Sequence, residues 1–181
     1  MRSFLSACPR AVVGLLALAF MRSAHSGAPD TSCQAPEWDM GREVSAFGTT
    51  AEAAATAHAR VKPPTLRLGR LYALTLFPQN EVEFIQPPAQ GHGSARLFGG
   101  VVRFPVATSG SYRVTVDAPL WIDVATVGGI IAPSGFIGWH ECPLYRKSVE
   151  YDLRAGQLLM LQLSGAPTAV TQITIEPPRI Q

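Results

Sequence analysis

The stretch Ser-Val-Glu-Tyr-Asp-Leu-Arg-Ala-Gly-Gln-Leu-Leu-Met-Leu-Gln-Leu, residues 148–163, decides the fold. Its first half places Val149, Tyr151 and Leu153 at every second position, with charged residues between them. This alternation is typical of a strand that has one face buried. Its second half is apolar on both faces apart from Gln162, which predicts a strand covered on both sides. The Ala-Gly pair between the halves predicts a tight turn.

Short runs rich in Val, Ile, Leu, Phe and Tyr continue outward from this stretch, interrupted by Gly, Pro or Asn at intervals of about 8–12 residues. We expect strands at 65–68, 72–76, 82–85, 97–104, 111–116, 120–124, 130–132, 148–153, 157–163 and 170–175. No helical pattern long enough for a parallel crossover separates them, so hairpins with turns at 108–110, 128–129 and 155–156 are favoured. The sequence predicts an all-β fold: one antiparallel, jelly-roll-like β-sandwich of about eight strands.

The N-terminus has the pattern of a secretory signal peptide over residues 1–26. Two arginines precede the apolar run Ala11–Met21, which is shorter than the ~20 residues that a membrane span needs. Small residues at Ala24 and Ser26 predict cleavage after Ser26. We therefore expect a periplasmic or secreted protein with no transmembrane span after cleavage. An uncleaved anchor is the alternative.

For the rest of the chain we predict an irregular N-terminal arm at 27–62 followed by the β-sandwich domain at 63–181. Within the arm, the alanines of Ala51–Ala59 favour a short helix. The chain has 181 residues, of which 15% are charged, which suits one compact domain. Its formal charge of +2 becomes −1 once the three signal arginines are removed. No basic patch is left to bind nucleic acid.

Export determines how the cysteines are interpreted. Cys8 leaves with the signal, and Cys33 and Cys142 remain in an oxidising compartment. An even pair there usually closes a disulfide, so we predict one between Cys33 and Cys142, which would tie the arm to a late loop. The alternative is a free or metal-bound thiolate at Cys142.

Three segments carry a resemblance to a known group: Gly-Ser-Tyr-Arg-Val at 110–114, Trp-Ile-Asp-Val at 121–124 and Lys-Ser-Val-Glu-Tyr-Asp-Leu at 147–153. With a loop that contains His140 and Cys142, the region from about 99 to 175 resembles small exported bacterial β-sandwich proteins of unknown function. Some of these are labelled homogentisate dioxygenase, a label that implies a mononuclear iron oxygenase. The Gly-x-Tyr-x-Val strand and the Leu-x-Ala-Gly-x-Leu turn also resemble the pre-peptidase C-terminal sandwich, which implies an accessory role beside a secreted protease.

A mononuclear iron oxygenase needs two histidines and a carboxylate on one face of the metal. The mature chain holds His58, His92 and His140, and no two of them have the spacing of a tight ligand pair. A site for one divalent metal built from His92, His140 and Glu141 requires both loops to lie at the same end of the fold. No Gly-x-Ser-x-Gly elbow or phosphate-binding glycine loop is present, so no catalytic residue is assigned and no cofactor is expected. Dioxygenases of that name are also much larger.

The candidate ligand-binding residues are Trp139, His140, Trp121 and Asp123. If Ile122 and Val124 face the core, Trp121 and Asp123 share the outer face, where a ring beside an acceptor could bind a sugar. Alternatively, Trp121 packs under the 133–143 loop while Asp123 bonds local backbone or pairs with Lys147, which we interpret as a structural residue. Trp139, beside His140 in that loop, is the best candidate for an exposed contact residue. We favour a non-catalytic binding or accessory protein with an envelope or extracellular ligand, a glycan or a protein; the alternative is a small metal-dependent enzyme, dioxygenase-like or hydrolytic.

Overall fold

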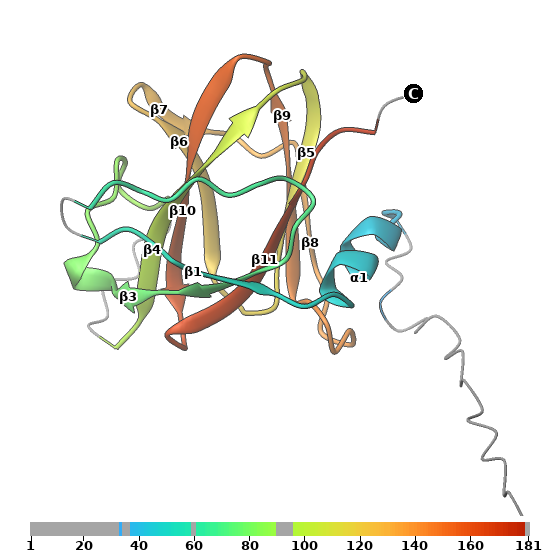
Figure 1. The fold of residues 1–181 in the computed structure, drawn as a ribbon, viewed down its shortest axis with the longest axis horizontal. Helices are drawn as coiled ribbons and strands as arrows, with labels where there is room; N and C mark the ends of the chain where they lie inside the picture. Colours follow the sequence, from blue (N-terminus) through green and yellow to red (C-terminus); the bar gives the residue numbers. More distant parts are fainter. Residues whose placement is uncertain (1–32, 34–36, 59–60, 90–95, 180–181) are drawn as a thin grey trace, which may run out of the picture.

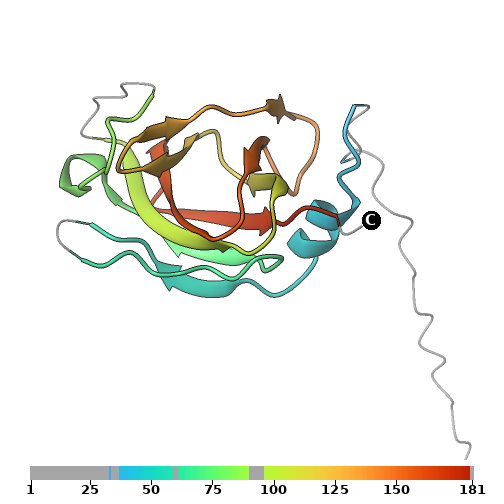
Figure 2. The same ribbon diagram turned by 90° about the horizontal axis from the view of Figure 1, so that it is seen from above.

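The computed structural model describes residues 33, 37–58, 61–89 and 96–179. The expected signal peptide lies outside these residues, as does His92. The described residues form two sheets packed face to face, with a short α-helix beside them (Figures 1 and 2). Helices in this part of the chain fall short of the length and hydropathy that a membrane span requires.

The strands belong to a six-stranded and a five-stranded sheet. In spatial order, the six-stranded sheet contains β1 (Glu52–Ala55), β2 (Tyr72–Thr75), β11 (Val170–Glu176), β5 (Gly110–Val116), β9 (Lys147–Leu153) and β8 (Gly135–Gly138). The five-stranded sheet contains, again in spatial order, β3 (Phe77–Pro78), β4 (Phe98–Val106), β10 (Gln157–Ala166), β6 (Trp121–Thr126) and β7 (Gly129–Ile131). Helix α1 spans Gly41–Phe47, and a 3-10 turn, η2, spans Gln79–Glu81.

The order of the long strands confirms the predicted fold class. The sequence β2-β11-β5-β9 in one sheet faces β4-β10-β6-β7 in the other, which is the strand order of a jelly roll. Strands β4, β5 and β6 alternate between the sheets, as do β9, β10 and β11. The turns at 108–110 and 155–156 therefore cross from sheet to sheet and are not the hairpins expected from the sequence. The expected hairpin at 128–129 is present between β6 and β7.

Alternating side chains of both sheets fill the core. On β9, Val149, Tyr151 and Leu153 are buried, as the period of two predicted. On β10, alternate leucines enter the same core, while Gln162 on the opposite face is only 1% exposed. Its side-chain oxygen accepts hydrogen bonds from the backbone N–H groups of Ile85 and Gln86. At Gln162 strand β10 is therefore covered on both faces, on one side by the other sheet and on the other by the segment after η2. Near its start the expected cover is missing, since Leu158 is 52% exposed.

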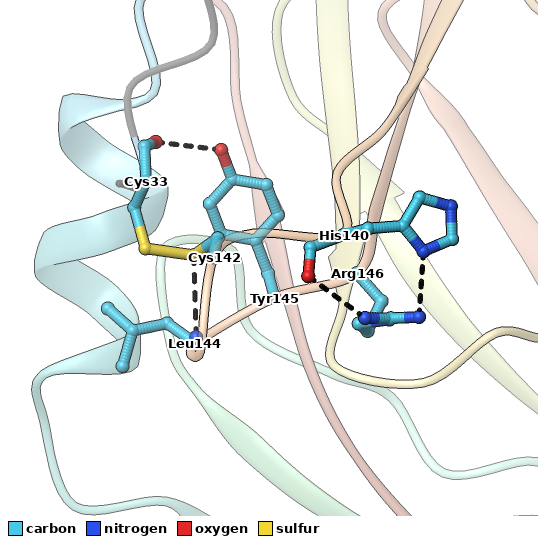
Figure 3. The surroundings of a disulfide bond; sticks show 6 residues. All are labelled: Cys33, His140, Cys142, Leu144, Tyr145 and Arg146. Carbon is cyan, nitrogen blue, oxygen red and sulfur yellow. Dashed lines mark hydrogen bonds between the residues drawn. A yellow bond between two sulfur atoms is a disulfide. The ribbon is translucent and has the colours of Figure 1, made fainter. Parts of the chain in front are cut away.

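A second hydrophobic cluster joins α1 to the loop before β9. Its buried members are Cys33, Met40, Phe47, Leu71, Cys142 and Tyr145. The predicted disulfide between Cys33 and Cys142 is confirmed, and it spans 109 residues of chain. The Tyr145 hydroxyl donates a hydrogen bond of 2.8 Å to the Cys33 carbonyl, so the loop is held to the arm beside the disulfide (Figure 3).

The N-terminal arm is more regular than expected. The helix predicted at Ala51–Ala59 is wrong, because Glu52–Ala55 pairs with β2 as a parallel edge strand. Alanine contributes only a weak helical preference, and backbone pairing overrides it. The helix lies earlier, at α1, where Met40, Val44 and Phe47 form one apolar stripe against the second cluster. The sandwich thus begins within the arm at β1 and not at residue 63.

Two other expectations about strands are wrong. Residues 82–85 form no strand, and the backbone N–H of Ile85 donates to the Gln162 side chain of β10. At 65–68 the chain makes only an isolated bridge between Thr65 and Arg103. Strand β8 was missed, since its four residues begin and end with glycine and carry little strand signal.

Candidate ligand-binding cleft

A cleft of about 280 Å³ opens at the side of the sandwich where the short strands β7 and β8 are the sheet edges. It is lined by Pro119, Leu120, Trp121, Phe136, Gly138, His140, Arg146 and Lys147. A smaller hollow of about 100 Å³ shares Trp121, Phe136 and Lys147 with it and is completed by Ile122, Pro133 and Val149. Both sheets thus contribute to one continuous, largely apolar depression.

Phe136 explains why the cleft exists. It pairs in register with Val149 of β9 and so belongs to the inner face of the six-stranded sheet. Val149 is 4% exposed, yet Phe136 is 69% exposed. The facing sheet ends at β7, a strand of three residues, and does not cover β8. An aromatic ring on a core-facing position is therefore left open to solvent.

Trp121 forms the wall contributed by β6, and its orientation is fixed by hydrogen bonds. The indole Nε1–H donates to Asp123 Oδ1 at 2.9 Å. Asp123 Oδ2 accepts the backbone N–H of Ala89 at 3.1 Å, and the residue is 4% exposed. Both carboxylate oxygens are therefore occupied within the protein. Asp123 positions the indole and is not presented to a ligand. This arrangement is close to the alternative in which Trp121 packs against the protein and Asp123 bonds backbone groups.

Lys147 is the first residue of β9, and its ammonium lies over the Trp121 ring, 4.4 Å from the centroid. Its one protein acceptor among the described residues is the Leu120 carbonyl, at a long 3.4 Å. Burial lowers the pKa of Lys147, and the nearby Asp123 charge opposes that shift. An ammonium has three donors, so this cation is incompletely satisfied by the protein alone.

His140 and Arg146 form the mouth of the cleft, at the two ends of the loop that the disulfide anchors (Figure 3). Arg146 Nη2 lies 2.9 Å from His140 Nδ1, and Nη1 donates to the His140 carbonyl at 3.2 Å. A guanidinium can only donate, so His140 Nδ1 is the acceptor and the ring proton resides on Nε2. The pair therefore presents N–H donors to the cleft.

The other candidate residues lie elsewhere. Trp139 packs partly buried against the second cluster and does not line the cleft. Glu141 is exposed beside His140. His58 stacks on Phe77 with ring centroids 3.9 Å apart. His92 lies outside the described residues, and among those described no three metal-ligating side chains come together.

Sequence reasoning missed Phe136 and Arg146 and treated Lys147 as a structural residue. The run Gly-Phe-Ile-Gly at 135–138, with two large apolar residues between glycines, was the available signal for Phe136. Arg146 follows His140 by six residues, a spacing that only the disulfide-anchored loop converts into a contact. No local pattern could have identified it.

A second cavity, of about 290 Å³, lies near α1 and the C-terminal residues. It is lined by Arg42, Ser111, Arg113, Glu150, Pro178 and Arg179. Its cations are paired within the protein: Arg113 reaches Glu150 at 3.0 Å and Glu43 at 3.3 Å, and Arg179 bonds Asp39. The arginines of this cavity are thus paired with carboxylates of the protein. By contrast, Arg146 and Lys147 of the cleft form no ion pair with a carboxylate among the described residues.

No protein-family model, curated protein or solved structure matches this chain.

Proposed function

We propose that this chain is an exported, non-catalytic binding or accessory protein whose ligand occupies the cleft between β6 and β8. The observation that carries the proposal is Phe136, a core-facing ring left 69% exposed on an edge strand, with Trp121 lining the same hollow. Exposed aromatic side chains in a concave site commonly mark a ligand-binding surface. A volume of about 280 Å³ is near the lower limit of ligand pockets, ~300 Å³, and suits a ligand of one or two rings.

Export is supported by two independent features. Residues 1–26 carry a signal-peptide pattern, and the disulfide between Cys33 and Cys142 is consistent with an oxidising compartment outside the cytoplasm. A periplasmic or secreted location follows as part of the proposal.

The polar groups of the cleft favour binding over catalysis. Asp123 is occupied by Trp121 and Ala89, so it does not provide a general base. His140 Nδ1 accepts from Arg146, and the adjacent guanidinium charge opposes a metal cation at that nitrogen. The metal-dependent alternative, built from His92, His140 and Glu141, gains no support from this geometry.

The test uses the neutral probe 2-naphthamide, titrated into ¹⁵N-labelled protein and followed by NMR. We expect saturable shifts of the Trp121 indole N–H and the Gly138 amide. Phe136→Ser removes the open ring and should abolish these shifts without unfolding the chain, because the side chain is already exposed. The matched control is Leu158→Ser, which removes a 52% exposed side chain from β10 and should leave binding unchanged. Absence of cleft shifts with the native protein would contradict the proposed function.

A further inference from the structure

We infer that the cleft selects an apolar ring that carries a carboxylate, with the carboxylate held by Lys147 and Arg146 and the ring between Trp121 and Phe136. This inference rests on the proposed function and specifies its ligand class. It follows from the charge, the hydrogen-bonding character and the shape of the lining.

The lining is positively charged. Lys147 and Arg146 contribute two cations, and no acidic side chain lines either hollow. The nearest buried carboxylate, Asp123, already accepts two N–H groups of the protein. Elsewhere the partly buried cation Arg113 is compensated by two glutamates. Neither Lys147 nor Arg146 has such a partner among the described residues.

The side chains of the lining donate hydrogen bonds. The Lys147 ammonium and the Arg146 guanidinium have no acceptor atoms, and His140 is held in the tautomer that carries its proton on Nε2. A sugar hydroxyl both donates and accepts, and its donors would find no side-chain acceptor in this lining. A carboxylate only accepts, so it matches this set of donors.

Lys147 supplies the strongest reason for an anion. Its ammonium is partly removed from water, and the protein returns the Trp121 face, one hydrogen bond of 3.4 Å and the charge of Asp123, which is not within ion-pair distance. Partial burial of a cation costs free energy unless it is paired. A ligand carboxylate beside Nζ restores the missing interactions, and the low local polarity strengthens the new ion pair.

Arg146 is prepared for the same group. Two N–H groups of its guanidinium hold the His140 carbonyl and Nδ1, which fixes its orientation at the cleft mouth. Its remaining donors are still available for a ligand, because a guanidinium has five. Holding the side chain in place before binding reduces the entropy lost when a ligand arrives.

The experiment compares 2-naphthoate with 2-naphthamide, which share a ring system and differ in charge. Dissociation constants are measured by calorimetry at low ionic strength for the native protein, Lys147→Met and Arg146→Gln. We expect naphthoate to bind the native protein about tenfold more tightly than the amide, because only the carboxylate forms a hydrogen bond in which both partners are charged. Each variant should bring the ratio of the two dissociation constants close to one, and this ratio is the readout. Lys62→Met, an exposed lysine outside the cleft, is the control.

Two outcomes overturn the inference. If the amide binds the native protein as tightly as naphthoate, charge does not select the ligand, and the proposed function still holds. If the preference persists in both Lys147→Met and Arg146→Gln, other groups hold the anion. If neither compound binds, the proposed function itself fails, so the two failures are distinguishable. Arg146→Gln keeps the test decisive should Lys147→Met fold poorly.

Discussion

Replacing Gln162 with leucine tests how the outer face of β10 is covered. The Gln162 side chain is buried, and its Oε1 accepts the backbone N–H groups of Ile85 at 2.7 Å and Gln86 at 3.0 Å. Its Nε2 donates to the Gln86 carbonyl at 3.0 Å. Leucine has a similar size but no polar atoms, so Gln162→Leu removes all three hydrogen bonds and leaves three backbone groups without these partners.

At about 1 kcal/mol for each hydrogen bond, the free energy of unfolding should fall by about 3 kcal/mol. With a urea slope of about 2 kcal/mol/M, the unfolding midpoint should decrease by about 1.5 M. Urea unfolding followed by tryptophan fluorescence measures the shift, and hydrogen exchange should accelerate at the Ile85 and Gln86 amides. Gln157→Leu, at an exposed position on the same strand, should change stability by less than about 0.5 kcal/mol. Unchanged stability together with unchanged amide protection in Gln162→Leu would refute the reasoning.

Three further substitutions probe the rest of the fold. Removing the disulfide with the double substitution Cys33→Ser and Cys142→Ser should cost about 4.7 kcal/mol, the value for a loop of ~100 residues. An equal urea midpoint for this variant and the oxidised native protein would contradict the expectation. Burial raises the pKa of Glu43 above its ordinary value of 4.5, so the native state keeps its proton to a higher pH than the unfolded chain does. The free energy of unfolding should therefore fall as pH rises from 4.5 through the raised pKa. Glu43→Gln should flatten that part of a pH–stability curve, and an unaltered curve would refute this assignment. Gly100→Ala would place a Cβ 2.1 Å from Thr56 Oγ1 and should cost about 2 kcal/mol or more in thermal unfolding, whereas Gly128→Ala, with its nearest neighbour at 3.6 Å, should be tolerated.

Strands with one buried face could be predicted from the sequence, and strands without that contrast could not. Tyr112, Val114 and Val116 on β5 alternate with polar residues, and the structure buries these three side chains in the core. Residues 82–85 were also expected to form a strand, but the backbone N–H of Ile85 donates to the Gln162 side chain of β10. Such a pairing partner is distant in sequence, so no local pattern reveals it.

The cleft could be predicted only in part, for the same reason. Trp121 and His140 were identified from their residue types and surroundings, and both line the cleft. Trp139 was expected to be exposed, yet it packs against the cluster formed around the disulfide. Whether an aromatic side chain in a loop faces solvent or a neighbouring element depends on tertiary packing. The exposure of Phe136 depends on the facing sheet ending before it covers β8, which no local pattern in the sequence indicates.

The position of β11 has a consequence for the timing of folding. This strand lies between β2 and β5, so the register of Tyr72 with Ile173 and of Val114 with Ile175 forms only after the chain has been made as far as β11. Contacts between such distant segments slow folding, because a long loop must close before any pairing is gained. The nascent chain therefore cannot complete the six-stranded sheet before β11 has been made, and β2 and β5 stay without their shared neighbour until then. A change that weakens β11 should for this reason slow folding more than an equally destabilising change in the edge strand β1.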